Sequence, residues 1–271
     1  MNDSYAGLDD AEIAVAAARA GAEVVRAGYG RRHSRIEKGA GDFATEVDVA
    51  AEEAILGVIR AARPEDAVHG EEGGQRGGAD AERRWLVDPL CGTLNYAAGS
   101  MLVAVNVALT DGPVAVADPF SGEVFFTREG TAWVRGEGGQ GGQGGDTPLA
   151  PTAATRLVDV NLDPPFPGAP AFRAVDLLAH PRFVEGFRPR VVSSTLALAW
   201  VAAGKRAAYV TDGNGLAGSV HFAAGIALCR AAGCVVTGVD GAPAGESGRG
   251  LVAAADAETH GALLSMIRRR G

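Results

Sequence analysis

Residues 85–96, WLVDPLCGTLNY, combine an apolar run, an acid, a glycine and a threonine in an order that could do chemistry. The run ends at Asp88, and the chain then passes through Gly92 into a segment expected to be helical. A strand that ends in a carboxylate and turns into a helix can hold both a metal ion and a phosphate group. Cys91 occupies a position where a second oxygen ligand would be expected for a hard cation such as Mg²⁺.

Further acids accompany this stretch. Asp42 and Asp48 lie in DFATEVDVAAEEAI, and Glu71 lies in HGEEGG. Taken singly, each acid also has a purely structural interpretation: Asp48 as a first-turn helix acid, Glu71 as a loop charge and Asp88 as a turn residue. Taken together with Thr93, these acids match the motifs of a known family.

These motifs, in this order, resemble the inositol monophosphatase family of Mg²⁺-dependent phosphatases. DFATEVDVAAEE is similar to D-x-x-T-x-x-D-x-x-x-E, and GEE to the family's metal-binding Gly-Glu-Glu. WLVDPLCGTLNY resembles W-I-V-D-P-I-D-G-T-x-N-F, and SVHFAAGIALCRAAGC resembles the late motif W-D-x-A-A-G-x-x-[IL]-x-x-E-A-G-G. The resemblance covers nearly the whole chain. It implies an α/β (α+β) fold, a layered αβαβα sandwich, and hydrolysis of a phosphate monoester on a small polyol, sugar or nucleotide.

The resemblance also implies roles for individual residues. Glu71, Asp88 and the backbone carbonyl of Leu90 would hold one Mg²⁺, while Thr93 with Asp48 would orient the attacking water. The amides of Gly92 and Thr93 would hold the phosphate. Weaker candidates for contacts to the substrate's hydroxyl groups are Ser194, Thr195, Asp212 and Asn214. A small-molecule substrate and a homodimer are the partners that the resemblance implies.

Two positions depart from the family pattern in a way that bears on metal binding. Cys91 and His221 stand where the family has the two aspartates that hold a second ion, and Val220 and Ala231 replace the late Trp and Glu. The second metal site is therefore degenerate, and we expect at most one weakly bound Mg²⁺. Because both positions serve one ion in the family, we also expect Cys91 and His221 to lie within about 5 Å of each other.

Three interpretations of Cys91 and His221 remain open. The first is loss of function, leaving a slow one-metal phosphatase or an inactive binding homologue. The second is a changed metal, since an oxygen, a sulfur and a nitrogen from Asp88, Cys91 and His221 suit Zn²⁺ better than Mg²⁺. The third is a metal-free enzyme that is not a phosphatase, in which Cys91 beside His221 is a nucleophile.

Periodic apolar residues predict the elements that would position these groups. Helices are expected over 10–28, with Asp9 and Glu12 resembling a capping box, and over 47–62. A short strand over 85–87 and successive strands over 102–109, 114–117, 123–127 and 132–135 predict an antiparallel β-meander. The Gly-rich residues 136–146 predict a flexible linker. We therefore expect an N-terminal α+β domain over 1–147 and a C-terminal α/β domain over 148–271 that closes the site.

The second half alternates strands and helices, which is typical of an α/β domain. Strands are expected over 157–161, 191–192, 207–211, 234–236 and 251–254. Helices are expected near 171–179, 195–203, 221–232 and 257–269.

Composition limits the classes of function. The 271 residues carry 25 Lys and Arg against 33 Asp and Glu, a formal net charge of −8, so nucleic acid is not an expected partner. The acidic start MNDSYAGLDD is unlike a signal peptide, and the uncharged run 191–204 is too short to span a bilayer. The three cysteines, 91, 229 and 234, predict a reducing cytoplasm rather than a disulfide framework, with Cys229 and Cys234 as small core residues.

Overall fold

The structure is a computed structural model that describes residues 5, 7–31, 34–39, 42–78, 80–136, 145–162, 173–213, 216, 218–244 and 249–268. The chain forms two compact units, Met1–Thr147 and Pro148–Gly271, and each is described by itself. Most of the Gly-rich segment 136–146 lies outside the described residues. None of the described helices combines the length and the apolar character that a membrane span requires.

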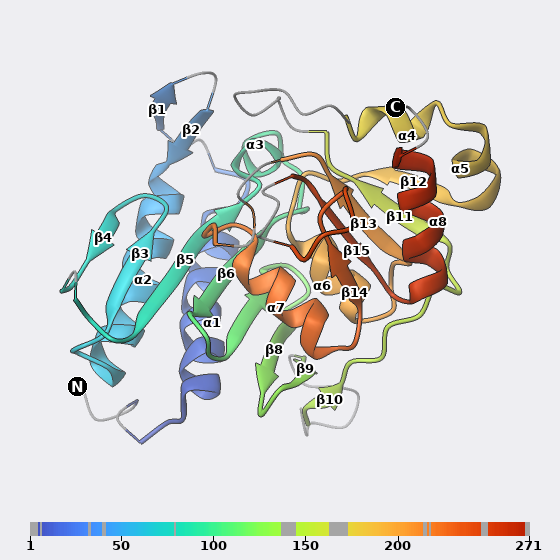
Figure 1. Ribbon diagram of the computed structural model, residues 1–271. Helices are drawn as coiled ribbons and strands as arrows, with labels where there is room; N and C mark the ends of the chain where they lie inside the picture. Colours follow the sequence, from blue (N-terminus) through green and yellow to red (C-terminus); the bar gives the residue numbers. More distant parts are fainter. Residues whose placement is uncertain are drawn as a thin grey trace. The chain divides into compact units, whose positions relative to one another are not determined.

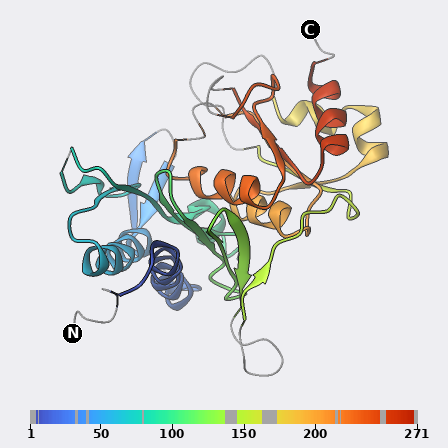
Figure 2. The same cartoon turned by 60° about the horizontal axis from the view of Figure 1, so that its bottom comes forward.

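Two long helices cover one face of the sheet in the first unit (Figures 1 and 2). They are α1 (Asp10–Gly28) and α2 (Glu46–Ala62), which agree with the predicted helices to within a residue. Asp9 caps α1 by accepting a hydrogen bond from the Glu12 amide at 2.8 Å, so the predicted cap is present on its Asp9 side. Both helices bury an apolar stripe, including Ile13, Ile55 and Ile59, in a shared core with the sheet.

The sheet of the first unit has the order β10-β9-β8-β7-β6-β5-β3-β4. The predicted meander is confirmed, since neighbours from β5 to β9 are antiparallel. Its strands are β5 (Arg84–Cys91), β6 (Ala104–Leu109), β7 (Val114–Ala117), β8 (Val124–Arg128) and β9 (Thr131–Arg135). The strand expected over 85–87 continues to Cys91, which lies at the end of the strand rather than after it.

The sequence pattern missed five short strands, four within this unit and one at its boundary with the second unit. They are β1 (Arg35–Gly39), β2 (Asp42–Thr45), β3 (Ala67–Gly70), β4 (Gly74–Arg76) and β10 (Thr147–Pro148). The first two form a separate antiparallel hairpin, and β3 pairs with β5 in parallel. The sheet is therefore mixed and not purely antiparallel. These strands have five residues or fewer, too few to establish a period-2 pattern.

The second unit contains a five-stranded sheet of order β12-β11-β13-β15-β14. Three of its strands run parallel: β11 (Leu157–Val160), β12 (Arg188–Val191) and β13 (Ala208–Thr211). Strand β15 (Leu251–Ala254) is antiparallel to β13, and β14 (Val235–Thr237) is antiparallel to β15. Helices α6 (Leu196–Ala202) and α7 (Ala223–Ala231) pack against each other and the sheet, and α8 (Ala257–Arg268) packs on β15.

The predicted elements of this unit are found with shifted ends. The helix expected near 171–179 is only the short α4 (Val175–Leu178), with residues 171–172 outside the described part, and a further helix α5 (Pro181–Gly186) follows it. Pro181 explains the division, because a proline starts a helix readily but cannot continue one. The strand expected at 191–192 lies earlier, over β12.

Candidate active site

The first turn of α2 holds the carboxyl group of Asp48 in place. Thr45 is the N-cap, and its hydroxyl accepts a hydrogen bond from the Val47 amide at 3.2 Å. Asp48 in turn accepts from the Thr45 amide at 2.8 Å and from the Thr45 hydroxyl at 2.6 Å, both through Oδ2. This reciprocal arrangement is a capping box, and it fixes the orientation of the Asp48 carboxylate.

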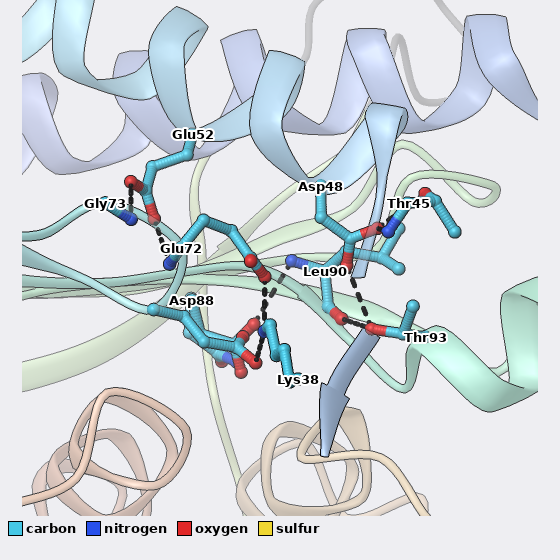
Figure 3. Close-up of polar contacts among 11 residues, drawn as sticks. Lys38, Thr45, Asp48, Glu52, Glu72, Gly73, Asp88, Leu90 and Thr93 are labelled. Carbon is cyan, nitrogen blue, oxygen red and sulfur yellow. Dashed lines mark hydrogen bonds and ion pairs between the residues drawn. The ribbon is translucent and has the colours of Figure 1, made fainter. Parts of the chain in front are cut away.

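The other carboxylate oxygen of Asp48 faces Thr93 (Figure 3). The Thr93 hydroxyl lies 2.9 Å from Asp48 Oδ1 and 3.2 Å from the Leu90 carbonyl oxygen. Because the hydroxyl has a single proton, it can donate a hydrogen bond to only one of these oxygens at a time. Burial raises the pKa of Asp48, and the hydrogen bonds from Thr45 and Thr93 oppose that rise. The pairing of Asp48 with Thr93, expected from the family resemblance, is thus present in the first unit.

The end of β5 presents Asp88 and the Leu90 carbonyl within the same few residues. Asp88 is fully buried, and its two carboxylate oxygens accept hydrogen bonds from the Leu90 amide at 3.1 Å and from Asn106 Nδ2 at 3.4 Å. A β-bulge interrupts the pairing with β6 between Asp88 and Cys91. A bulge inserts one extra residue into a strand and bends it, and here the bend leads the chain towards Gly92.

Gly92 makes the turn from β5 into the short helix α3 (Thr93–Ala97). Its φ of 106° lies in the left-handed region, which a residue with a side chain adopts only at a cost. The chain therefore reverses sharply between the Leu90 carbonyl and the Thr93 hydroxyl, which brings these two groups within hydrogen-bonding distance.

Glu71 lies on a loop that hydrogen bonds to Glu52 hold in place. The buried Glu52 carboxylate accepts hydrogen bonds from the amides of Glu72 at 2.8 Å and Gly73 at 2.7 Å. Gly70, just before this loop, has no room for a side chain, since a Cβ there would lie 2.4 Å from Glu52 Oε2. The loop is thereby held so that carboxylate oxygens of Glu71 and Asp88 lie within 4.8 Å of each other.

Lys38 contributes a positive charge to this acidic centre. From β1, its ammonium forms ion pairs with Glu71 at 2.9 Å and Glu72 at 2.7 Å. Burial acts to lower the pKa of Lys38, but the hydrogen bond to Glu72 and the charge of Glu71 outweigh it, so the pKa is raised. Lys38 stays protonated near neutral pH and neutralises part of the negative charge that would attract a cation.

Sequence reasoning missed Lys38, Glu52 and Asn106 as contributors to this centre. Glu52 could have been found, because it is the final acid of the quoted D-x-x-T-x-x-D-x-x-x-E pattern. Lys38 and Asn106 carry no such signal, since they lie in a short hairpin and in the apolar strand β6. Asp42, the first acid of the pattern, begins β2, and its side chain lies outside the described part.

Cys91 and His221 belong to different units. Cys91 is partly exposed at the end of β5, and His221 is partly exposed just before α7. Their separation stays a prediction, as does the participation of His221 in any metal site of the first unit.

The remaining candidates lie near the carboxyl ends of parallel strands in the second unit. Ser194 and Thr195 are buried between β12 and α6, and Asp212 directly follows β13. Asp212 Oδ2 accepts hydrogen bonds from Arg173 Nε at 2.7 Å and from the Ala174 amide at 2.8 Å, so this oxygen is engaged within the unit. Asn214 lies outside the described residues.

Comparison with known proteins shows the family to which the chain belongs. The model of the inositol monophosphatase family matches residues 9–270. The chain is 36% identical to the inositol-1-monophosphatase ImpA of Mycolicibacterium smegmatis over 252 residues, which covers 89% of this chain and 86% of the relative. It is 32% identical to the probable inositol 1-monophosphatase ImpA of Mycobacterium tuberculosis, with 79% and 77% covered.

Solved structures share the fold at low sequence identity. The Thermotoga maritima IMPase superimposes with a TM-score of 0.79 at 20% identity, covering 97% of this chain and 98% of that one. The extragenic suppressor protein SuhB of Bartonella henselae gives a TM-score of 0.77 at 23% identity, covering 95% and 98%. The expected fold class is thereby confirmed. The motifs, the family model and these relatives agree that the chain belongs to the inositol monophosphatase family, Mg²⁺-dependent phosphatases that act on small molecules.

Proposed function

We propose that the protein hydrolyses a phosphate monoester on a small polyol, sugar or nucleotide. The observation that carries this proposal is the Asp48–Thr93 hydrogen bond of 2.9 Å beside the buried Asp88. It supplies an oriented acceptor for a water proton next to a carboxylate suited to a cation. The name of an Aquifex aeolicus relative, fructose-1,6-bisphosphatase/inositol-1-monophosphatase, supports a substrate range wider than inositol phosphates.

The described residues fit one Mg²⁺. Glu71 and Asp88 offer carboxylate oxygens within 4.8 Å of each other, and Leu90 offers a carbonyl oxygen nearby in the chain. These are the hard oxygen donors that Mg²⁺ prefers. The ion, when bound, would lower the pKa of a water molecule and neutralise charge on the phosphoryl oxygens. Lys38 pairs with Glu71, so we expect the affinity for this ion to be weak.

Thr93 and Asp48 would move the proton of the attacking water. While the Thr93 hydroxyl donates to Asp48, its oxygen keeps lone pairs that can accept a hydrogen bond from water. As the water attacks, its proton would pass to Thr93 Oγ1, and the Thr93 proton would pass to Asp48. Asp48 must be ionised for this role, and the hydrogen bonds from Thr45 favour that form.

The remaining roles follow from the family resemblance. The amides of Gly92 and Thr93 would hold the phosphate, and Ser194, Thr195, Asp212 and Asn214 would contact the substrate's hydroxyl groups. A homodimer in the cytoplasm belongs to the same proposal. The second metal site would be degenerate, because Cys91 and His221 replace its two carboxylates.

A different chemistry at Cys91 is the competing proposal. Cys91 is partly exposed, and a nucleophile or a Zn²⁺ ligand requires a thiol that its substrate or ion can reach. In that case Cys91 and His221 would serve a Cys–His enzyme that is not a phosphatase, either metal-free or with Zn²⁺. A catalytically inactive binding homologue is the remaining alternative.

Phosphate release from a series of phosphate monoesters, measured with Mg²⁺ and with EDTA, tests the proposal. Asp88→Asn and Glu71→Gln should each abolish turnover, and Thr93→Ala should slow it by roughly 10²-fold or more. Glu53→Gln is the matched control, since Glu53 is half exposed on α2 and pairs with Arg76 instead. Full activity of Asp88→Asn, or the absence of hydrolysis from the whole series, would contradict the proposal.

A further inference from the structure

The C-terminal end of α7 closes in a Schellman turn. The Cys234 amide donates a hydrogen bond to the Cys229 carbonyl at 2.9 Å, and the Gly233 amide donates to the Arg230 carbonyl at 3.0 Å. Gly233 has a φ of 89°, the left-handed conformation that this turn requires. These two bonds and the glycine define the motif, in which the side chains of its first and sixth residues meet.

Both of those residues are cysteines. Cys229 is fully buried and Cys234 is 9% exposed. A hydrogen bond between the two thiols, together with burial, raises the pKa of Cys229. The Cys229 thiol also lies 3.2 Å from the Leu198 carbonyl oxygen of α6, which holds it at the inner side of the helix.

The backbone places the two residues within the range of a disulfide. Because the Cys229 carbonyl oxygen and the Cys234 nitrogen are 2.9 Å apart, standard bond lengths limit the separation of the two Cα atoms to about 7 Å. Disulfides span up to roughly this distance, and the side chains already face each other. A bond between the sulfur atoms would therefore follow the existing backbone contact and leave the turn intact.

We propose that Cys229 and Cys234 form a reversible dithiol–disulfide couple at the end of α7. The oxidant is a low-molecular-weight disulfide such as oxidised glutathione. The Cys234 thiolate attacks it, releasing one glutathione thiol and leaving a mixed disulfide. The Cys229 thiolate then attacks the Cys234 sulfur and releases the second glutathione thiol. One disulfide is reduced, one is formed, and the two cysteine protons end on the two released thiols.

Burial determines the order and the pace of these steps. Cys234 is the more exposed residue of the two and meets the oxidant first, whereas the fully buried Cys229 is out of reach of a bulky reagent. Since only the thiolate attacks and the pKa of Cys229 is raised, ring closure is slow at neutral pH and accelerates as pH rises. The couple is independent of the proposed phosphatase site, so failure of one proposal leaves the other standing.

Trypsin offers a direct test, because Arg230 lies between the two cysteines and the next cleavage sites are Arg206 and Arg249. The full-length protein carrying Cys91→Ser, which removes the third thiol, is treated with oxidised glutathione under native conditions. The reaction is quenched with acid, and the remaining thiols are alkylated before digestion. We expect peptides 207–230 and 231–249 to appear mainly as a linked pair, lighter than the two free peptides by two hydrogen atoms, and to separate on reduction.

Single substitutions in the same background separate the two steps. Cys229→Ser should leave Cys234 as a mixed disulfide with glutathione, whereas Cys234→Ser should leave Cys229 largely unmodified. Treatment in guanidinium chloride serves as the positive control for detecting the linked pair. Absence of the pair from natively treated protein would overturn the proposal and leave the cysteines as small apolar residues of the turn.

Discussion

The carboxyl group of Asp48 is subject to opposing influences. Burial favours its neutral form, whereas donors from Thr45 and Thr93 favour the carboxylate. The net effect is a raised pKa, so the ionised form that would accept a proton from Thr93 is reached only at a higher pH than for an ordinary aspartate. The activity of a phosphatase built on this pair should therefore fall as pH drops through that raised value.

Thr45→Ala tests this dependence. The substitution removes the hydroxyl that donates to Asp48 at 2.6 Å and so removes one source of stabilisation of the carboxylate. The pKa of Asp48 should rise further, and the acidic limb of the kcat/KM profile should move to higher pH. Thr45→Ser keeps the hydroxyl and should restore the original limb. A limb that moves to lower pH, or not at all, would rule out Asp48 as the group that must be ionised.

Lys38 is the other single residue whose role can be measured. Its ammonium pairs with Glu71, the carboxylate assigned here to Mg²⁺. Lys38→Met removes a competing cation about one ion-pair distance away, so Mg²⁺ should bind roughly tenfold more tightly by calorimetry, about 1.4 kcal/mol. Lys205→Met, at an exposed position in the second unit, is the control. Weaker binding in Lys38→Met would mean that the ammonium instead positions the carboxylate.

At the scale of elements, the site of the first unit depends on contacts between segments. Helix α2 supplies Asp48 from its first turn, and one turn later Glu52 holds the loop that follows β3. Strand β5 supplies Asp88, and the hairpin β1–β2 supplies Lys38. A change in the spacing between α2 and β3 should therefore displace Glu71 without touching any proposed metal ligand.

Gly70→Ala makes that change. The added Cβ would lie 2.4 Å from Glu52 Oε2, so the loop or the helix must shift. We expect a loss of about 1–3 kcal/mol in the free energy of unfolding, measured with urea, together with reduced phosphatase activity. Gly57→Ala on the exposed face of α2 meets no atom within 4 Å and should instead stabilise the protein by about 0.5–1 kcal/mol. Equal stabilities for the two variants would contradict the close approach.

At the scale of the whole molecule, Cys91 belongs to the first unit and His221 to the second, and substitution tests the metal site that we propose they replace. The family pattern places an aspartate at both positions, and restoring both should rebuild the second metal site. If the protein is a weakened phosphatase, the double variant Cys91→Asp with His221→Asp should gain Mg²⁺-dependent hydrolysis, while each single variant gains little. Steady-state phosphate release by the four proteins of this cycle measures the gain.

The Cys–His alternative predicts the reverse pattern. Cys91→Ala alone should then abolish the native reaction, EDTA should not inhibit a metal-free enzyme, and the Cys91 thiol should react quickly with iodoacetamide near neutral pH. For the phosphatase, EDTA should abolish activity and Cys91→Ala should leave it unchanged. The retained set of Asp48, Glu71, Asp88 and Thr93 favours the phosphatase, because a thiol enzyme would have little use for it.

The sequence by itself determined the elements whose pattern is local. Apolar periodicity predicted α1 and α2 almost to the residue, and short apolar runs separated by turn residues predicted the meander from β5 to β9. The resemblance of the ordered motifs to those of the inositol monophosphatase family also singled out Asp48, Asp88 and Thr93. The helices and strands, by contrast, depend on residues within a few positions of one another, so the order of side chains along the chain is sufficient to predict them.

Only the tertiary structure decided how those motifs are supported. The pairing of Lys38 with Glu71 spans 33 positions, and the contact of Glu52 with the Gly73 amide spans 21. The parallel pairing of β3 with β5 likewise involves a strand, the four-residue β3, that is too short to predict from alternation. Contacts of this kind are selected by packing across the sheet and by the need to satisfy buried polar groups. A linear pattern of residue types does not contain that information.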